Sequence, residues 1–171
     1  MSKLDIVGIC SGYFNPLHDG HLEYLHAALD YCYEQVKSND EDVYLLVIIN
    51  NDKQVRLKGS IPFLPDKIRE QIISDLAIVD STFISKDNDL SVAQTLQLLT
   101  KLFQVDQDNK FYFINAGDRS SSNFNQNEHE VCQRCGIEEV WLDLPKINSS
   151  SEILNKVGRE WFERRLKNEQ N

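Results

Sequence analysis

The sequence predicts an α/β fold, a single domain with an open parallel sheet of about five strands and helices on both faces. Short apolar runs rich in Val, Ile and Phe recur along the chain. They show no clean alternation of apolar and polar residues, which is typical of strands covered by helices on both sides. Segments with apolar residues three and four positions apart, the spacing of a helix, lie between them. At 171 residues the chain is long enough for one well-buried core and needs no second domain.

Strands and helices are expected to alternate along the chain. The five expected strands span residues 6–9, 43–49, 79–84, 111–114 and 140–144. Helical spacing is clearest at Leu22, Leu25, Leu29, Cys32 and Val36, and again at Val92, Leu96, Leu99 and Phe103. A further helix is expected around Lys67 and Arg69, another ends at Gly136, and the last begins at about residue 149. Segment 50–59 is expected to be a loop, as are the polar segments 39–42 and 120–127.

The charge and hydropathy of the chain exclude several classes of partner. The formal net charge is -9, whereas a general nucleic-acid binder carries a basic footprint. The longest apolar run after the acidic segment 40–42 is 43–49, far shorter than the about 20 residues that a membrane span needs. The N-terminal segment does not have the longer apolar stretch of a secretory signal. We therefore expect a cytoplasmic protein with no nucleic acid and no membrane among its partners.

The four cysteines indicate thiols and not disulfides. Cys10, Cys32, Cys132 and Cys135 are too sparse for a disulfide-stapled fold and suit a reducing compartment. Cys132 and Cys135 form a CxxC pattern three residues after His129. One such half-site supplies too few ligands for zinc. We expect these two thiols to pack on a helix face, and we expect no metal ligands from the protein.

The segment GYFNPLHDGH, residues 12–21, lies where the first strand should turn into the first helix. Ligands of open parallel sheets bind at such carboxyl ends of strands. Gly12 permits a tight exit from the strand, and Gly20 lets a ligand approach the backbone closely. His18 and His21, three residues apart, would share one face of the first helical turn, beside N–H groups that favour phosphate. A lone histidine is more often a local cap, but two of them at a strand end favour a phosphate site.

Basic residues gather after the second strand of this acidic chain. They are Lys53, Arg56, Lys58, Lys67 and Arg69. A solvated loop would explain these charges without any ligand. The alternative is a clamp on a polyphosphate, because Lys and Arg neutralise the charge that grows on transferring and leaving oxygens. We favour the clamp.

Two later segments add candidate residues. After the fourth strand, Gly117 allows close approach, and Asp118 and Arg119 are candidates for contact with a ligand or Mg²⁺. After the fifth strand, Ser149 precedes Glu152 by three residues, the spacing of a capping box at a helix start. The same hydroxyls and N–H groups can bind phosphate, and both roles can hold. Two helix starts, one with histidines and one with serines, are thus candidates to flank one triphosphate.

Residues 12–21 resemble the HxGH signature of the nucleotidyltransferase superfamily that includes cytidylyltransferases and nucleotide adenylyltransferases. The matching positions are Gly12, Phe14, Pro16, His18, Gly20 and His21. NNDKQVRLKG resembles the segment after the second strand of the smaller members, and SSSEI resembles their final motif. The resemblance runs from residue 6 to about residue 155 and implies a Rossmann-like fold over nearly the whole chain.

This resemblance implies transfer of a nucleotidyl group from a nucleoside triphosphate, ATP or CTP, to a phosphate monoester. Mg²⁺ would be the cofactor, pyrophosphate would be released, and no covalent enzyme intermediate would form. By position, His18, His21 and Lys58 would be catalytic, with both histidines on the α-phosphate and Lys58 holding phosphates. Together with the candidates taken from the residues themselves, the expected nucleotide and phosphate site comprises Gly12, Phe14, Asn15, Gly20, Arg69, Asp118, Arg119, Ser149, Ser150 and Ser151. The size and motifs suit adenylyltransferases of heptose phosphate and cytidylyltransferases of glycerol phosphate or phosphoethanolamine, so we expect a sugar or polyol phosphate as acceptor.

Three positions depart from the family pattern. Many smaller members have Asp where this chain has Asn15, Leu154 stands where Arg or Lys is common, and Asn148 replaces Ile or Val. The last two leave open a second hypothesis, a nucleotide-binding sensor or scaffold that keeps the site without the chemistry. A third, purely structural hypothesis gives the histidines and serines capping roles alone.

The last helix includes Trp161, Phe162 and Leu166 in the run GREWFERRL. These side chains could pack either on the core of the domain or on a partner subunit, and homodimers are common in the superfamily. We favour the core.

Overall fold

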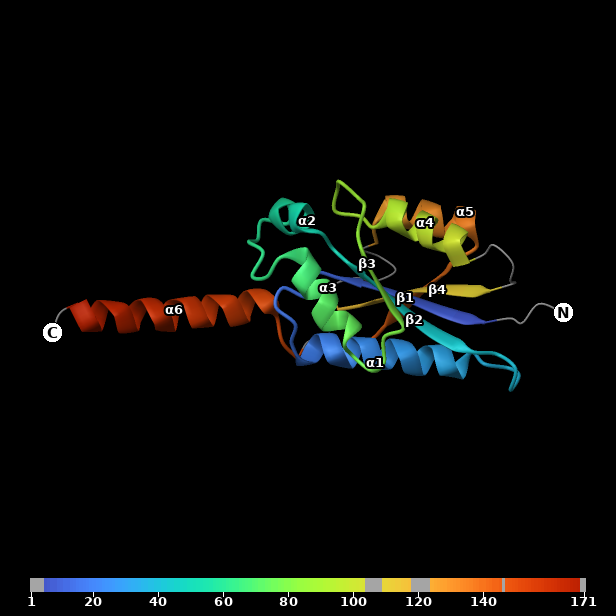
Figure 1. Cartoon of the computed structure of the whole chain (residues 1–171), viewed down its shortest axis with the longest axis horizontal. Coiled ribbons are helices and arrows are strands. Elements are labelled where there is room, and N and C mark those ends of the chain that lie inside the picture. The colour runs from blue at the N-terminus through green and yellow to red at the C-terminus, as the bar shows by residue number, and fades with distance from the viewer. Residues whose placement is uncertain (1–4, 104–108, 118–123, 146, 170–171) are drawn as a thin grey trace.

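The computed structural model describes residues 5–103, 109–117, 124–145 and 147–169. In this part of the chain five strands form one parallel sheet with helices on both faces (Figure 1), which confirms the predicted α/β class. The strands are β1 (Ile6–Gly12), β2 (Val43–Ile49), β3 (Ser81–Ile84), β4 (Lys110–Ala116) and β5 (Glu138–Leu142). The helices are α1 (Asp19–Glu34), α2 (Asp52–Leu57), α3 (Asp66–Ser74), α4 (Ala93–Phe103), α5 (Gln126–Cys135) and α6 (Ser150–Glu169).

The order of strands places β1 at the centre of the sheet. The order is β3-β2-β1-β4-β5, and β1 pairs in parallel with β2 on one side and with β4 on the other. After β1 the chain adds β2 and β3 on one side of the sheet, and then β4 and β5 on the other side. In open sheets of this kind ligands bind in the crevice at the carboxyl end of the strands where the order reverses. The loop from β1 to α1 lies at that point.

Alternate residues of the central strands face two separate apolar cores. On one face Cys10 of β1 and Val47 of β2 pack against α1 and α3, and on the other Ile9 and Ile48 pack against α4 and α5. Because both faces are covered, the strands are apolar throughout. Helix α1 lies directly on β1, since a Cβ at Gly8 would stand 2.5 Å from the Sγ of Cys32. This contact holds the last turn of α1 close to the first half of β1.

We expected segment 50–59 to be a loop, but it contains α2. Asn51 caps this helix: its side chain accepts a hydrogen bond from the Gln54 N–H, and the Gln54 side chain accepts one from the Asn51 N–H, both at 3.0 Å. The buried Gln54 amide also donates to the carbonyls of Asp89 and Ser91. A six-residue helix is too short to show apolar periodicity, so its polar caps are the signal that the sequence offered.

The last helix, α6, extends away from the rest of the described chain (Figure 1). Trp161 is 60% exposed and Phe162 58%, so the expectation that this helix packs on the core is wrong. The reason is that only its first turn is tied to the domain, by hydrogen bonds near Ser150. Within the described residues, no helix has the length and apolar character needed to cross a membrane.

Candidate functional site

The loop after β1 is shaped by a contact between Gly12 and Phe14. Phe14 has a φ of 47°, in the left-handed region that residues other than glycine seldom adopt, and its side chain is buried. Its ring covers Gly12, where a Cβ would stand 2.7 Å from the nearest ring carbon. The same ring lies 5.0 Å from that of His21, centroid to centroid. The Phe14 ring therefore lies between Gly12 and the His21 ring, and it packs against both.

His18 and His21 lie together at the start of α1. Their rings stack with centroids 3.8 Å apart and planes inclined by 26°. His18 is the N-cap residue with extended backbone, and His21 is the third residue of the helix, so its ring folds back toward the cap. The Nδ1 atom of His21 accepts a hydrogen bond of 3.3 Å from the backbone N–H of His18. The structure thus brings the two rings onto one face of the first turn.

Both imidazole rings are neutral at neutral pH. Burial, followed by the positive charges of His18 and Lys58, lowers the pKa of His21 to about 3. Burial also lowers the pKa of His18, against the opposing effect of the Asp19 carboxylate. Because Nδ1 of His21 accepts a hydrogen bond, we assign the proton of its neutral ring to Nε2. A ligand oxygen in front of the two rings could therefore accept a hydrogen bond from the Nε2–H group of His21.

The Nδ1 atom of His18 is buried and makes no hydrogen bond within the described part of the chain. The nearest carboxylate oxygen, on Asp19, is 3.8 Å away, beyond hydrogen-bonding distance. A Cβ at position 20 would stand 3.2 Å from the His18 ring, so Gly20 leaves the space that this ring occupies. A buried polar atom without a partner is rare in proteins. Here it lies at the N-terminus of a 16-residue helix, where N–H groups attract anions.

Lys58 reaches the histidine pair from the end of α2. Its Nζ atom lies 4.5 Å from the centroid of the Tyr13 ring, in the loop before the histidines. Its charge contributes to the lowered pKa of His21, which places the two side chains within electrostatic reach of each other. Tyr13 was not among the residues singled out from the sequence, because no spacing marks a cation–π contact between distant segments. Lys58 is positioned to approach an anion bound in front of the histidines.

The start of α6 lies against the start of α1. The hydroxyl of Ser150 donates to the carbonyl of Pro16 at 2.9 Å, and the Asn148 amide donates to the Asp19 carboxylate at 3.0 Å. Ser149 accepts a hydrogen bond from the Glu152 N–H at 3.4 Å, as a cap does. The two helix starts that the sequence indicated are therefore neighbours. Asn148, a departure from the family pattern, is one of the residues that joins them.

Arg69 is fully buried and bonded to its own chain. It donates to the carbonyls of Leu64, Tyr13 and Asn50 and to the carboxylate of Asp52, the last at 2.7 Å. The side chain is 1% exposed. Four donated bonds leave one N–H of the guanidinium, so this geometry argues against the phosphate-holding role expected for Arg69. Arg69 instead joins the loop after β1 to α2 and α3.

Asn15 is also buried and hydrogen-bonded to other segments of its own chain. Its amide donates to the carbonyl of Ile61 at 2.8 Å and accepts from the N–H of Phe63 at 2.5 Å, and the residue is 4% exposed. The side chain thus holds the segment between α2 and α3 against the loop after β1. A nucleotide contact, as expected for Asn15, would have to replace one of these bonds.

The five basic residues after β2 do not form one clamp. Lys53 donates to the Asn88 side chain, and Arg56 donates to the carbonyl of Asp52 in its own helix. Of the five, Lys58 is the one whose charge acts on the histidine pair. Ser151 is exposed on the first turn of α6. The candidates Asp118 and Arg119 lie outside the described residues.

The CxxC segment packs against the core. Cys132 is 1% exposed, and burial raises the pKa of its thiol, so the thiol is protonated. His129 is hydrogen-bonded to Glu139 on β5. Across the residues that the structure describes, no three His, Cys, Asp or Glu side chains are grouped as a metal would require. The two thiols therefore take the packing role expected for them.

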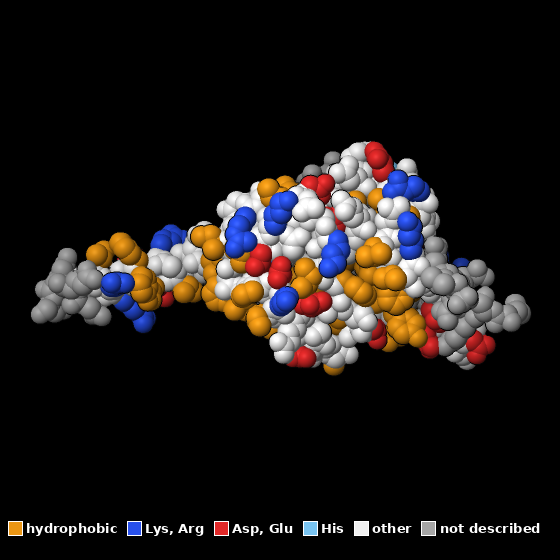
Figure 2. Space-filling model, turned by 45° about the horizontal axis from the view of Figure 1, so that its top comes forward, with side chains coloured by type: hydrophobic (Ala, Val, Ile, Leu, Met, Phe, Trp, Pro, Cys, Tyr) orange, Lys and Arg blue, Asp and Glu red, His pale blue; other side chains and the backbone are white. Residues whose placement is uncertain are grey.

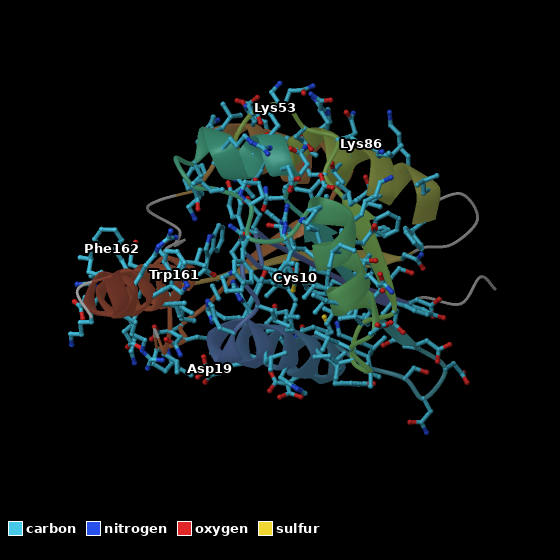
Figure 3. All side chains as sticks on the ribbon, turned by 60° about the vertical axis from the view of Figure 1, so that its left-hand side comes forward. Cys10, Asp19, Lys53, Lys86, Trp161 and Phe162 are labelled. Atoms are coloured by element: carbon cyan, nitrogen blue, oxygen red, sulfur yellow. The ribbon has the colours of Figure 1, made fainter. Side chains whose placement is uncertain are left out.

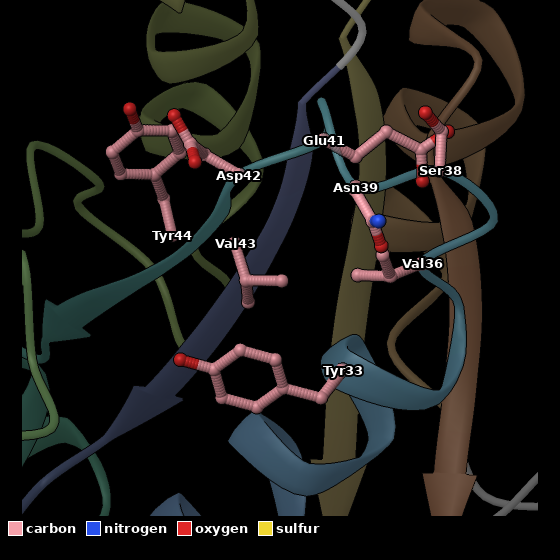
Figure 4. Close-up of a pocket in the computed structure, with 8 residues that line it drawn as sticks. All are labelled: Tyr33, Val36, Ser38, Asn39, Glu41, Asp42, Val43 and Tyr44. Carbon is pink, nitrogen blue, oxygen red and sulfur yellow. The ribbon is translucent and has the colours of Figure 1, made fainter.

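A cavity of about 400 Å³ opens at the end of α1 and the start of β2 (Figure 4). It lies at the amino ends of the strands, whereas the histidine pair follows the carboxyl end of β1. Glu41 and Asp42 are among its lining residues, and no basic side chain is. The cavity is therefore unsuited to a phosphate and separate from the histidine site.

The comparisons with known proteins agree with the fold. The cytidylyltransferase-like family model matches residues 9–156. FAD synthases of Thermoplasma volcanium and Thermoplasma acidophilum are 28% and 25% identical over 103 residues, 60% of this chain. The match covers 65% of each relative, so it spans just under two thirds of their length. The crystal structure of a lipopolysaccharide core biosynthesis protein from Thermoplasma volcanium has a TM-score of 0.55 at 22% identity, over 84% of this chain and 98% of that one, and so shares the fold.

Proposed function

Since the chain belongs to the cytidylyltransferase-like family, we propose that it is a nucleotidyltransferase that acts on ATP or CTP and a phosphate monoester. The observation that carries the proposal is the stacked pair of neutral histidines at the start of α1, next to the start of α6 and within reach of Lys58. Two helix starts, two imidazoles and an ammonium group together favour a polyphosphate. The buried Nδ1 of His18, which has no hydrogen-bond partner among the described residues, supports the same conclusion, since a ligand would satisfy it.

In the proposed reaction an oxygen of the acceptor phosphate attacks the α-phosphorus of the nucleotide. The bond from this phosphorus to the bridging oxygen of the β-phosphate breaks, and pyrophosphate leaves with the electron pair. Such transfers depend mainly on positioning and on stabilising the charge of the phosphate oxygens. The Nε2–H of His21 would donate to an α-phosphate oxygen, and Lys58 would neutralise charge on the neighbouring phosphates. Backbone N–H groups at the start of α6 would hold the triphosphate tail.

The donor set of this chain fits a metal ion that arrives with the nucleotide. Mg²⁺ usually keeps several waters and is held by substrate phosphates with one or two carboxylates. The described residues contain no group of three or more potential ligands, but the exposed carboxylate of Asp19 lies beside the histidine pair. In departure from the expectation of no metal ligand from the protein, Asp19 would be a ligand here, and the bound Mg²⁺ would neutralise phosphate charge.

The acceptor is proposed to be a sugar or polyol phosphate. The curated relatives are FAD synthases, and FAD contains an AMP group joined to a flavin phosphate. A flavin phosphate is therefore the second acceptor class to test. The relatives' name favours ATP as donor, while the family description favours CTP.

The test is release of pyrophosphate by the full chain with Mg²⁺. Each of ATP, CTP, GTP and UTP is paired with sugar phosphates, polyol phosphates and FMN. We expect release with one pair, and a loss of roughly 100-fold or more in kcat for His18→Ala and His21→Ala. His26→Ala is the matched control, because His26 is exposed on the same helix away from the pair. Nucleotide binding without release by any pair would instead support the sensor hypothesis, and full activity of His21→Ala would refute the mechanism.

A further inference from the structure

The ammonium group of Lys58 is held by an aromatic ring and not by a carboxylate. Within the described part of the chain its Nζ atom makes no hydrogen bond and no ion pair. Its contact is with the face of the Tyr13 ring, 4.5 Å from the centroid. A cation within about 6 Å of the centroid is attracted by the negative face of such a ring. Tyr13 is thus the residue that holds the end of this side chain.

Other basic side chains near α2 are placed elsewhere. Lys53 and Arg56 each donate a hydrogen bond to a neighbour of their own. Figure 3 shows Lys53 and Lys86 on the outer side of the molecule, opposite Asp19 at the start of α1. On the face shown in Figure 2, Lys and Arg side chains stand apart from one another, with acidic side chains between them. Because no broad basic patch covers this face, the position of a single ammonium group matters for an anion at the histidine site.

The backbone is fixed beneath both side chains of the contact. Lys58 ends α2, and its N–H donates to the carbonyl of Gln54 at 3.0 Å. The carbonyl of Tyr13 accepts a hydrogen bond of 2.6 Å from the guanidinium of Arg69, which is itself buried. A change to the Tyr13 ring should therefore release the ammonium group of Lys58 without moving either segment.

A ring holds an ammonium group in a different way from a carboxylate. A carboxylate would accept hydrogen bonds from the group and cancel its charge, so that an incoming phosphate would have to displace it. The face of a tyrosine ring attracts the cation without a net charge of its own. An ammonium group has three N–H donors, and those that point away from the ring stay free for phosphate oxygens. The contact can thus persist when an anion binds in front of the histidines.

We propose that Tyr13 is a positioning residue of the nucleotide site, whose ring keeps the Lys58 ammonium group beside the histidine pair before the triphosphate arrives. The inference rests on the proposed function, in which Lys58 neutralises charge on the phosphates. A free lysine side chain would lose its rotamer freedom when the nucleotide binds, a cost that lowers affinity roughly 2- to 10-fold. A side chain that is already held does not incur this cost. The charge of Lys58 also contributes to the lowered pKa of His21, as expected of an ammonium group held near that ring.

The test compares Tyr13→Leu and Tyr13→Phe with the original chain. Calorimetric titration measures the dissociation constants of ATP and CTP in the presence of Mg²⁺. Tyr13→Leu removes the ring and should raise the dissociation constant of the nucleotide that binds roughly 2- to 10-fold. Tyr13→Phe keeps the ring and should stay within about 2-fold of the original. Tyr33→Leu is the matched control, because Tyr33 is 59% exposed near the other end of α1, and it should leave the constant unchanged.

A double-mutant cycle separates positioning from general damage to the site. The variant Lys58→Met keeps most of the side chain and removes the ammonium group. In this background Tyr13→Leu should have no further effect on the dissociation constant, because no ammonium group is left to position. A merely structural role of Tyr13 would cost the same factor in both backgrounds.

Proton NMR tests the contact in the chain without nucleotide, independently of any activity. Protons above the face of an aromatic ring are shifted upfield. The ε-methylene protons of Lys58, assigned by comparison with Lys58→Met, should therefore resonate upfield of the ordinary lysine position. Tyr13→Leu should return them to that position, whereas Tyr13→Phe should keep the shift.

Four results would overturn the role of Tyr13 while leaving the proposed function intact. They are an ordinary position of the Lys58 signal, an equal effect of Tyr13→Leu with and without the ammonium group, an equal loss in Tyr13→Phe and Tyr13→Leu, and tighter nucleotide binding by Tyr13→Leu. The last would show that the ring holds Lys58 away from the phosphates. If the original chain shows the upfield signal but binds no nucleoside triphosphate, the proposed function itself is refuted, and the role of Tyr13 in nucleotide binding with it.

Discussion

The lowered pKa of His21 predicts that this residue makes the fold sensitive to acid. In the variant His21→Gln the side-chain oxygen can still accept the hydrogen bond from the backbone N–H of His18, since Gln is a common residue at this position of a capping box. The variant therefore keeps the local structure and removes the titrating group. We expect its stability at pH 8 to lie within about 1 kcal/mol of the original.

The size and direction of the effect follow from the two pKa values. The ordinary pKa is 6.5 and the value in the fold is about 3, because of burial first and then of the charges of His18 and Lys58. Between these values the unfolded chain binds a proton that the folded chain does not, so stability falls as the pH falls. With about 1.4 kcal/mol for each pKa unit, the loss from His21 is about 2 kcal/mol at pH 5 and approaches 5 kcal/mol below about pH 3.

The assay is urea unfolding of both proteins at pH 8 and pH 5. Carboxylates elsewhere also titrate, but they are the same in both proteins, so the difference between the two losses isolates His21. The original chain should lose about 2 kcal/mol more than His21→Gln between these pH values. Equal losses would refute the conclusion that the buried ring of His21 is neutral in the fold.

Three further substitutions test how the site is held together, each by chemical denaturation. Gly12→Ala should cost about 1–3 kcal/mol because its Cβ meets the Phe14 ring, and the cost should shrink in a Phe14→Leu background; an equal cost in both backgrounds would contradict this contact. Arg69→Lys should cost about 3–5 kcal/mol, since an ammonium group cannot replace four bonds in a buried place, and a stable variant would point to a surface role. Ser150→Ala should cost about 0.5–1.5 kcal/mol through its bond to the loop after β1, whereas the exposed Ser151→Ala should cost little.

The fold and the centre of the site were predictable from the sequence because their signals are local. The apolar runs mark the strands, and the spacing of His18 and His21 places both rings on one helical turn once the start of α1 is known. Helix starts can also be predicted from capping residues, which is why the expected start of the last helix, at about residue 149, lies next to the observed start at Ser150. These inferences need no knowledge of which distant segments meet.

The role of Arg69 could not be predicted, because it depends on contacts between distant segments. Its partners lie 5, 17, 19 and 56 positions away in the chain, so the sequence shows a basic residue but not its burial. The same holds for Asn15, whose partners lie 46 and 48 positions away. For α6 the sequence shows an apolar face, and only the structure shows that the domain does not cover it.

The crowding of positive groups at the site predicts that nucleotide binding takes up protons. Burial, followed by the positive charges of His18 and Lys58, lowers the pKa of His21, and burial lowers the pKa of His18, so both histidines are neutral when no anion is present. A bound triphosphate brings negative charge next to the rings and stabilises their protonated forms, which raises both pKa values. By linkage, nucleotide affinity should then increase as the pH falls from 8 toward 6, with net proton uptake.

Calorimetric titration with ATP or CTP, in two buffers of different ionisation enthalpy, measures that uptake directly. The nucleotide's own phosphate titrates too, and the comparison with His21→Gln removes this contribution because it is common to both proteins. The original chain should take up more protons than the variant at pH 6 and about the same number at pH 8. Equal uptake at pH 6 would mean that the phosphate does not lie against His21, and the proposed role of its Nε2–H at the α-phosphate would fail with it.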